Sequence, residues 1–201
     1  MARKRSSEIE VPPAAPAVPP YGFVPRKVFF TRGFGIHRER LSSFEMALRK
    51  AGIASFNLVT VSSIYPAKCR RVTREEGLSK MTPGQIVFCV MARQDTNEKG
   101  RSCSAGIGVA VPRDKARFGY LSEHHGFGMT EKETEDYVED LAVEMLCTVM
   151  GVEYNASATW DEKREIWKIS GNIYDSFNVV QAKEGVAGHW VTCVAAAVFC
   201  A

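Results

Sequence analysis

The stretch Thr130–Gly151 reads TEKETEDYVEDLAVEMLCTVMG and gives the clearest structural signal in the chain. Thr130 and Glu133 have the spacing of a capping box, in which two residues satisfy each other's backbone N–H groups at the start of a helix. Apolar residues then recur at helical intervals, and Gly151 stands where a helix often needs a left-handed residue to end. The apolar positions are Val138, Leu141, Ala142, Met145, Leu146 and Val149. The pattern predicts a long helix with one apolar face.

Strand patterns dominate the rest of the sequence. The run Gln85–Met91 is almost wholly apolar, which is typical of a strand buried on both faces. One further helix is expected at Arg38–Ala51, after a loop marked by Gly33 and Gly35. Because the strands do not alternate regularly with helices, a layered domain of strands and helices is favoured over a doubly wound sheet. The other expected elements are strands at Lys27–Thr31, Phe56–Val61, Ser104–Val111, Ile169–Val180 and Trp190–Cys200, a polar loop or strand edge at Gly119–Gly128, and a helical turn at Trp160–Ile166.

Composition narrows the class of protein. The chain has 201 residues, of which 45% are hydrophobic, and this suits one compact domain. Its net charge of +3 is too small a bias to indicate a nucleic acid partner. No apolar run approaches the roughly 20 residues of a membrane-spanning helix, so no membrane partner is expected. The six cysteines are scattered, which argues against a metal cluster or a disulfide framework and suits the cytoplasm.

The N-terminal region differs in composition from the remainder. Residues 1–23 are rich in proline and carry no apolar core of a signal peptide. Such a segment buries little surface, so we expect it to be disordered. The sequence therefore predicts a disordered extension over 1–23 and a single domain over 24–201.

Three polar features inside or beside the predicted elements are candidates for chemistry. The pair Ser62-Ser63 follows the expected strand Phe56–Val61, where serines commonly bond to the local backbone of a turn. Asn57 lies within that strand, where asparagine is unfavourable, so it either faces water at an edge or has a functional partner. Glu45, on the shorter helix, is either solvated or a ligand for a cation. On the residues alone, the serine pair indicates an ordinary turn.

Two charged segments are also candidates. The segment Glu123-His124-His125-Gly126-Phe127-Gly128 holds three titratable groups. Neighbours in a strand point to opposite faces, so the histidines would not converge on a metal, but Glu123 or a histidine could act as a general acid or base. The basic run Lys68-Cys69-Arg70-Arg71 with Arg74 could contact an anion. A solvated surface is the simpler interpretation of both segments.

Taken in order, several segments resemble the pyruvoyl-dependent arginine decarboxylase family, from about Pro25 to Ala201. Each segment alone is weak, but their combination is specific to that family. They are Leu41-Ser42-Ser43-Phe44-Glu45, Ala51-Gly52-Ile53, Phe56-Asn57-Leu58-Val59-Thr60-Val61-Ser62-Ser63-Ile64, Pro83-Gly84-Gln85-Ile86-Val87-Phe88-Cys89, Gly119-Tyr120-Leu121-Ser122-Glu123-His124-His125-Gly126-Phe127-Gly128 and Ala195-Ala196-Ala197-Val198-Phe199. The resemblance implies an α+β fold, a layered α/β/β/α sandwich with mainly antiparallel sheets in a single domain. It also implies homotrimers with sites between neighbouring chains, which can pair into a dimer of trimers.

The resemblance also implies a self-processing enzyme. The precursor would cut itself between Ser62 and Ser63, giving a β chain of residues 1–62 and an α chain of residues 63–201. The Ser63 hydroxyl would attack the Ser62 carbonyl, and elimination followed by hydrolysis would leave a pyruvoyl cofactor at position 63. That group forms a Schiff base with L-arginine and releases carbon dioxide and agmatine. By resemblance, Asn57 polarises the Ser62 carbonyl and Glu123 protonates the product carbon. Because a carboxylate is the natural partner of the arginine guanidinium, Glu45 is the candidate for substrate binding, together with Ser62.

Three alternatives stay open at this point. A pyruvoyl-dependent decarboxylase of another amino acid is possible, because the cofactor chemistry is indifferent to the substrate side chain. An inactive relative that stays uncleaved and serves as a binding or regulatory subunit is a second alternative. A histidine-based metalloenzyme is disfavoured by the poor ligand spacing.

Overall fold

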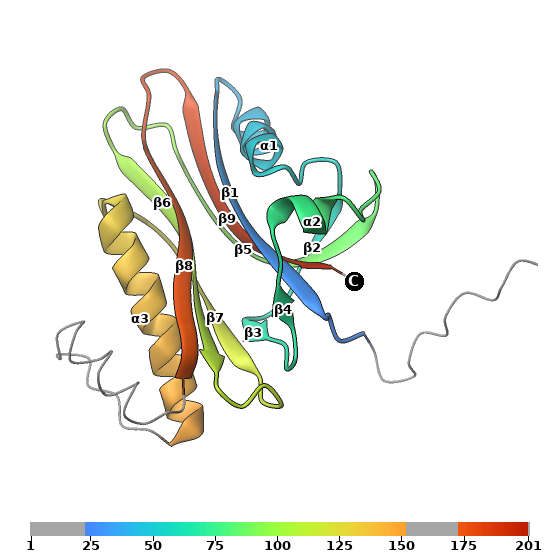
Figure 1. Ribbon diagram of the computed structural model, residues 1–201. Coiled ribbons are helices and arrows are strands. Elements are labelled where there is room, and N and C mark those ends of the chain that lie inside the picture. Colours follow the sequence, from blue (N-terminus) through green and yellow to red (C-terminus); the bar gives the residue numbers. More distant parts are fainter. Residues whose placement is uncertain (1–22, 152–172, 201) are drawn as a thin grey trace, which may run out of the picture.

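The computed structural model describes residues 23–151 and 173–200, and this part of the chain forms two packed sheets with three helices (Figure 1). The order of elements confirms a single α+β domain. The elements are β1 (Lys27–His37), α1 (Arg40–Ala51), β2 (Asn57–Thr60), β3 (Ile64–Tyr65), β4 (Arg70–Arg71), α2 (Arg74–Leu78), β5 (Ile86–Thr96), β6 (Ser102–Pro112), β7 (Gly119–Phe127), α3 (Glu131–Met150), β8 (Ile173–Glu184) and β9 (Trp190–Cys200).

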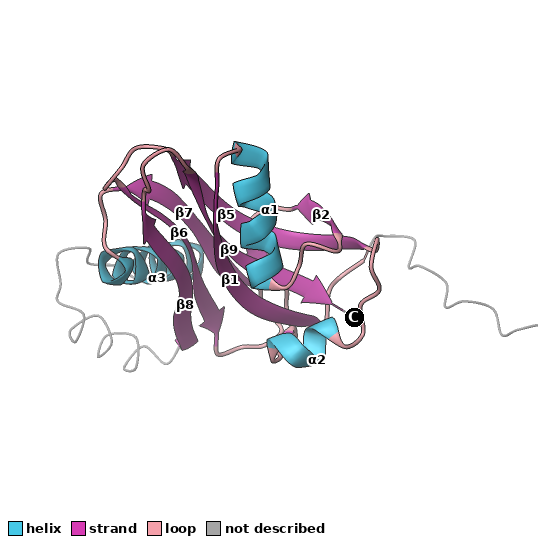
Figure 2. Ribbon diagram, turned by 90° about the horizontal axis from the view of Figure 1, so that it is seen from above, coloured by secondary structure: helices cyan, strands magenta, loops and turns pink. Residues whose placement is uncertain are grey.

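The two sheets differ in their strand directions. The first has the order β2-β5-β9-β1-β4, in which β9 runs antiparallel to both neighbours and the outer pairs β2–β5 and β1–β4 are parallel. The second has the order β3-β7-β6-β8 and is antiparallel throughout. Helix α1 lies on the outer face of the first sheet and α3 on that of the second (Figures 1 and 2). These layers confirm the expected α/β/β/α sandwich.

Strand β9 shows how the sequence produces these layers. Successive side chains of a strand point to opposite faces. Val191, Cys193, Ala195, Ala197 and Phe199 therefore enter the core between the sheets, whereas Val194, Ala196, Val198 and Cys200 enter the core beneath α1. Every residue from Val191 to Cys200 is buried, because both faces are covered and both edges are paired.

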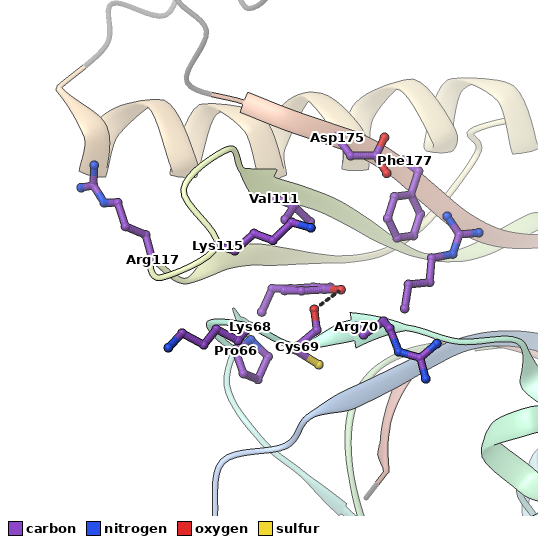
Figure 3. A pocket seen from close by; sticks show the side chains of 11 residues that line it. Pro66, Lys68, Cys69, Arg70, Val111, Lys115, Arg117, Asp175 and Phe177 are labelled. Atoms are coloured by element: carbon purple, nitrogen blue, oxygen red, sulfur yellow. Dashed lines mark hydrogen bonds between the residues drawn. The ribbon is translucent and has the colours of Figure 1, made fainter.

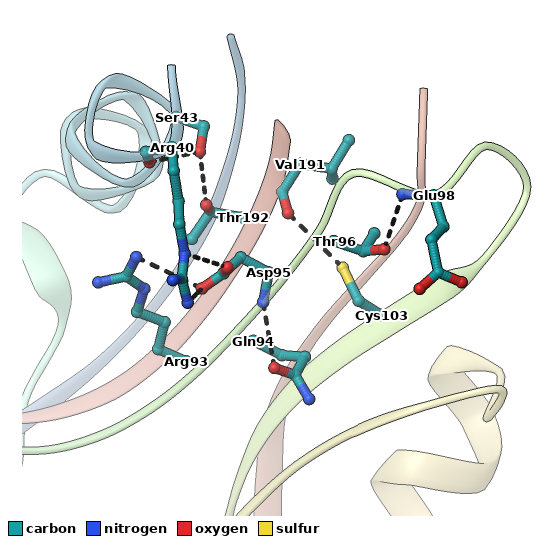
Figure 4. A network of polar contacts seen from close by, with 10 residues as sticks. All are labelled: Arg40, Ser43, Arg93, Gln94, Asp95, Thr96, Glu98, Cys103, Val191 and Thr192. Atoms are coloured by element: carbon teal, nitrogen blue, oxygen red, sulfur yellow. Dashed lines mark hydrogen bonds and ion pairs between the residues drawn. The ribbon is translucent and has the colours of Figure 1, made fainter. Parts of the chain in front are cut away.

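Helix α1 is fastened to the first sheet by polar contacts as well as by apolar packing (Figure 4). The Ser43 and Thr192 hydroxyl groups lie 2.7 Å apart in the buried interface. The guanidinium of Arg40 pairs with Asp95, whose side chain is only 7% exposed. A buried carboxylate needs such a partner, and this pair therefore fixes the start of the helix against β5.

The expected loop at Gly33 and Gly35 was wrong, because β1 continues through both glycines to His37. A Cβ at Gly35 would lie 2.0 Å from the backbone oxygen of Ser43, and one at Gly33 would lie 2.3 Å from that of Ala47. The glycines therefore mark the close approach of α1 to the strand. They carry no turn.

Other boundaries were predicted with mixed success. The capping box of Thr130 and Glu133 and the left-handed Gly151 are confirmed at the two ends of α3. The segment expected as a polar loop or strand edge forms the regular strand β7 over Gly119–Phe127, and the single-turn helix α2 was not anticipated. The helical turn expected at Trp160–Ile166, most of the extension over 1–23 and the first four residues of the strand expected from Ile169 lie outside the described residues.

Candidate active site

The segment 61–63 carries the chain from one sheet to the other. The Val61 N–H donates to the Cys89 carbonyl at 2.9 Å within the first sheet. The Leu121 N–H donates to the Ser63 carbonyl at 2.9 Å within the second. Strand β3 then pairs with β7, with Ile64 opposite Tyr120. The bond between Ser62 and Ser63 therefore lies in a short crossover that is held at both ends.

The carbonyl of Ser62 already has a hydrogen-bond donor. The Ile64 N–H donates to it at 2.9 Å, which closes a three-residue turn centred on Ser63. A donor at a carbonyl oxygen stabilises the negative charge that develops there when a nucleophile attacks the carbon. The sequence did not reveal this donor, because a backbone N–H has no residue signature.

The Ser63 hydroxyl donates to Glu123 Oε1 at 3.2 Å. Glu123 lies on β7, and the register of β3 against β7 brings the two side chains together although they are 60 residues apart. Burial raises the pKa of the Glu123 carboxyl, while the hydrogen bond from Ser63 and the charge of His125 oppose this shift. The arrangement places a carboxyl that holds its proton to higher pH beside the serine hydroxyl.

His125 and His124 lie on opposite faces of β7, as their adjacent positions predicted. His125 shares the face of Glu123 and influences its charge. The His124 ring packs against Tyr137 of α3 with 4.6 Å between centroids, and burial lowers its pKa. Within the described residues, no group of three or more metal-ligating side chains comes together.

The helices of the described chain are too short or too polar to span a lipid bilayer.

Asn57 begins β2, at the edge of the first sheet, and its side chain faces outward. Its Nδ2 atom donates to the Gly84 carbonyl at 2.6 Å, across the turn that precedes β5. Within the described part of the chain, no hydrogen bond joins the side-chain amide of Asn57 to Ser62. The role expected of Asn57 at the Ser62 carbonyl stays a prediction.

Glu45 is not brought to the serine pair within one chain. Its carboxylate pairs with Arg49 one turn along α1, at 2.8 Å, and its side chain is 42% exposed. Figure 1 shows α1 toward one end of the sandwich and β3 toward the other. The role expected of Glu45 in substrate binding stays a prediction.

An apolar hollow of about 340 Å³ lies beside the crossover, and Ser62 forms part of its wall. The other lining residues are Phe23, Pro25, Val61, Ile64, Pro66, Phe88 and Phe199. Several apolar side chains near it are also exposed, namely Val59 at 41%, Ile64 at 38%, Ile86 at 64% and Phe88 at 39%. Exposed apolar side chains gathered in this way mark a surface suited to contact with another protein chain.

Comparison with known proteins identifies the family of the chain. A family profile described as "Pyruvoyl-dependent arginine decarboxylase" matches residues 27–201. A "Probable pyruvoyl-dependent arginine decarboxylase" of Chloroherpeton thalassium is 55% identical over 88% of this chain and 97% of its own length. "Pyruvoyl-dependent arginine decarboxylase 2" of Methanosarcina acetivorans is 52% identical over 88% of this chain and 97% of its own length. The corresponding protein of Nitrosopumilus maritimus is 51% identical over 87% and 96%. The chain belongs to the pyruvoyl-dependent arginine decarboxylase family.

Proposed function

We propose that this chain cuts itself between Ser62 and Ser63 and then decarboxylates L-arginine to agmatine with the pyruvoyl group that remains at position 63. The observation that carries the proposal is the contact of the Ser63 hydroxyl with Glu123, beside a Ser62 carbonyl that accepts from the Ile64 N–H. The relatives at 51–55% identity are named as arginine decarboxylases, which supports arginine over another amino acid.

The cut begins when Ser63 Oγ attacks the Ser62 carbonyl carbon. Glu123 accepts the hydroxyl proton, the Ile64 N–H stabilises the negative oxygen, and the peptide nitrogen leaves with a proton to give an ester. Removal of the Ser63 α-proton then expels the Ser62 carboxylate by β-elimination. One water molecule hydrolyses the new N-terminal enamine, through its imine tautomer, to a ketone and ammonia. Serine is required at position 63 because its oxygen is first the nucleophile and then the leaving group.

The residues around Ser63 fit the pyruvoyl group. Ser63 stands at a solvent-accessible crossover next to an apolar hollow, so that a substrate can reach position 63. The group supplies an electron-withdrawing ketone that takes up the electrons released as carbon dioxide leaves. Glu123 returns a proton to the substrate α-carbon, and its raised pKa keeps that proton available. Asn57 assists at the Ser62 carbonyl once its amide turns from Gly84.

A second copy of the chain completes the site in this proposal. The guanidinium of arginine is planar and always charged, and a carboxylate is its natural partner. Within its own chain Glu45 pairs with Arg49, and in this proposal it serves a neighbour that packs on the exposed apolar side chains near the crossover. A homotrimer, with three equivalent sites between chains, satisfies this requirement.

Intact mass measurement with product analysis tests the self-cut and the reaction together. Purified protein should give two chains, with the α chain lighter by one ammonia than a chain that begins with Ser63 and blocked at its N-terminus, and it should release agmatine from arginine. Ser63→Ala should remain one chain and inactive, whereas Ser62→Ala, which keeps the nucleophile, should still be cut. An intact wild-type chain in folded protein would overturn the proposal. Release of carbon dioxide from lysine or ornithine in preference to arginine would overturn the substrate.

Mixing two inactive variants tests the shared site. Ser63→Ala lacks the cofactor and Glu45→Gln lacks the guanidinium partner. If the site spans two chains, co-expression of the two variants places an intact Ser63 against an intact Glu45 and restores part of the activity. Arg49→Gln removes the ion-pair partner of Glu45 within α1 and serves as the matched control, which should stay active alone. Activity that does not return in the mixed protein would show that Glu45 does not act across the interface.

A further inference from the structure

A second cleft lies between the loop that joins β3 to β4 and the loop that joins β6 to β7 (Figure 3). Its volume is about 380 Å³. Its floor is apolar and is formed by Tyr65, Pro66, Val111 and Phe177. Basic side chains dominate the rest of its lining, namely Lys68, Arg70, Arg71, Lys115 and Arg117, with Asp175 as the one carboxylate.

The positive charge of this cleft is only partly neutralised. Arg70 pairs with Glu76 at 3.0 Å, outside the lining residues. Across residues 23–151 and 175–200, no carboxylate lies within ion-pair distance of Lys68, Arg71 or Arg117. Lys68, Arg71 and Arg117 outnumber the one carboxylate of the lining, Asp175, and this excess of positive charge favours a ligand with more than one negative charge.

Two contacts hold the cleft in shape without a ligand. The Lys68 N–H donates to the Lys115 carbonyl at 2.9 Å, which joins the two loops across the opening. The Arg71 guanidinium lies 4.0 Å from the centre of the Phe177 ring, a cation–π contact that orients the group and leaves its N–H edge available. A preorganised cationic site loses little entropy on binding an anion.

The backbone of Lys68 is a further mark of this loop. Its φ of 59° is the one left-handed value at a non-glycine residue in the described chain. A lysine in this conformation is held there by its surroundings, and such outliers gather at ligand-binding positions. Here the turn directs the chain between Tyr65 and Cys69, where the tyrosine hydroxyl donates to the Cys69 carbonyl at 3.2 Å.

We propose that this cleft binds a small organic phosphate. Phosphate groups would lie against Lys68, Lys115 and the free edge of Arg71, because ammonium and guanidinium groups bind a compact multiple charge well. The apolar body of the ligand would cover Val111 and Phe177. The substrate arginine is excluded, because its guanidinium would meet the same excess of positive charge.

This inference is independent of the proposed decarboxylation. None of the residues that line the cleft is Ser63, Asn57 or Glu123. The two sites adjoin each other, because Pro66 lines both the cleft and the apolar hollow beside Ser62. Strand β3 also links them, since Tyr65 pairs with Gly119 while the Ser63 carbonyl accepts from the Leu121 N–H. A bound phosphate that joins both loops should therefore stabilise the strand pair that holds the crossover.

Calorimetric titration of the full chain at low ionic strength, without magnesium, tests the proposal with three probes of similar charge. ADP has phosphates and an apolar body, pyrophosphate has phosphates alone, and citrate has carboxylates alone. ADP should bind at least about tenfold more tightly than pyrophosphate, through the area it buries, and pyrophosphate more tightly than citrate. Failure of ADP to bind at about 1 mM, equal binding of ADP and pyrophosphate, or a preference for citrate would overturn it.

Variants that remove charges test whether ADP binds in this cleft. Lys68→Gln with Lys115→Gln should lower the affinity for ADP by about tenfold or more, since two charge-assisted contacts are lost. Lys99→Gln removes the same charge from an exposed position elsewhere and should leave the affinity within about twofold. Asp175→Asn removes the repelling carboxylate and should tighten binding. An equal loss in Lys99→Gln, or unchanged affinity in both Asp175→Asn and the double lysine variant, would place the ADP elsewhere and overturn the proposal.

Discussion

Strands β9 and β2 belong to the same sheet and have opposite environments. In β9 every residue from Val191 to Cys200 is buried, whereas in β2 only Leu58 is even partly covered. Strand β9 has neighbours on both edges, while β2 forms the edge itself. Two of the residues with proposed chemistry, Asn57 and Ser63, lie on this exposed strand and its crossover, while the third, Glu123, lies on β7 of the second sheet.

This difference in burial indicates that one group of residues determines the stability of the fold and another determines cleavage and turnover. Substitutions in the buried strands and their covering helices should act on stability, because they change packing at near-solid density. Substitutions at the crossover should act on cleavage and turnover with little effect on stability. Substitutions in each region test whether effects on stability and effects on catalysis are as separate as the burial pattern indicates.

The largest effect is expected from Glu123→Gln at the crossover. A positioned general acid or base contributes about 10²–10⁴-fold to a rate, so turnover by the processed enzyme should fall by that factor. Self-cleavage should slow as well, because the glutamine cannot accept the Ser63 proton. In the uncut precursor the glutamine still accepts a hydrogen bond from the Ser63 hydroxyl, so the unfolding midpoint of the precursor in urea should move little. Turnover per cleaved chain and urea titration of the uncut chain check the two parts, and a stability loss as large as that of a core substitution would break the comparison.

The pH dependence of turnover and of stability provides the control for Glu123→Gln. The raised pKa of Glu123 keeps its carboxyl protonated above the ordinary range, so its favourable contribution to stability is complete below the unfolded pKa and is lost as pH rises through the folded pKa. The alkaline fall in turnover should follow the same titration. Glu123→Gln should remove this limb from both the activity and the stability profiles, and a limb that persists would belong to another group.

The two regions also differ in how far the sequence predicts them. The hydrophobic periodicity of α3 and the apolar runs at Gln85–Met91 and Trp190–Cys200 predicted buried elements, because burial imposes a repeat on the residues themselves. The loop expected at Gly33 and Gly35 failed because a glycine is required equally by a turn and by close helix packing, and only the structure shows which.

The site residues were harder to predict from local sequence patterns than the buried elements were. Taken alone, Ser62-Ser63 looked like an ordinary turn, and only the resemblance to a family raised it to a nucleophile. The contact of Ser63 with Glu123 depends on the register of β3 against β7, which no local pattern encodes. The Ile64 N–H has no side-chain signature at all. The alternation of strand side chains could have placed His125 beside Glu123, since the two are separated by one residue.

A smaller effect, on stability alone, is expected from Gly108→Ala in the buried strand β6. A Cβ there would lie 1.8 Å from the Val138 carbonyl of α3, so either the helix or the strand must move. We expect a loss of about 3 kcal/mol or more, the upper end of the cost of overpacking. Gly84→Ala is the comparison at the exposed edge, where nothing lies near the added atom but φ is +83°.

Chemical denaturation of both glycine variants sharpens the contrast. Gly84→Ala should cost only about 1–2 kcal/mol, the penalty of a left-handed conformation. This variant should also slow processing, because the Gly84 carbonyl accepts the hydrogen bond from Asn57. Equal stability losses in the two variants would show that burial does not separate the regions.

The smallest effect is expected at the start of α3, the helix that covers the second sheet. Thr130→Ala removes the hydroxyl that caps the Glu133 N–H and should cost about 1 kcal/mol. Thr148→Ala is the control on the same helix, since its exposed hydroxyl bonds only to the Glu144 carbonyl behind it. Thr148→Ala should be nearly neutral, and processing and turnover should be unchanged in both variants.

The pH dependence of the Thr130 effect decides whether the capping box is its cause. Hydrogen bonds from the backbone and side chain of Thr130 lower the pKa of Glu133 below its ordinary value of 4.5. A lowered folded-state pKa gives stability that is present above the unfolded pKa and is lost as pH falls through the folded one. The difference between wild type and Thr130→Ala should therefore be full near neutral pH and shrink in acid. If it stays constant down to low pH, Glu133 does not share in the cap, and the hydroxyl of Thr130 acts alone.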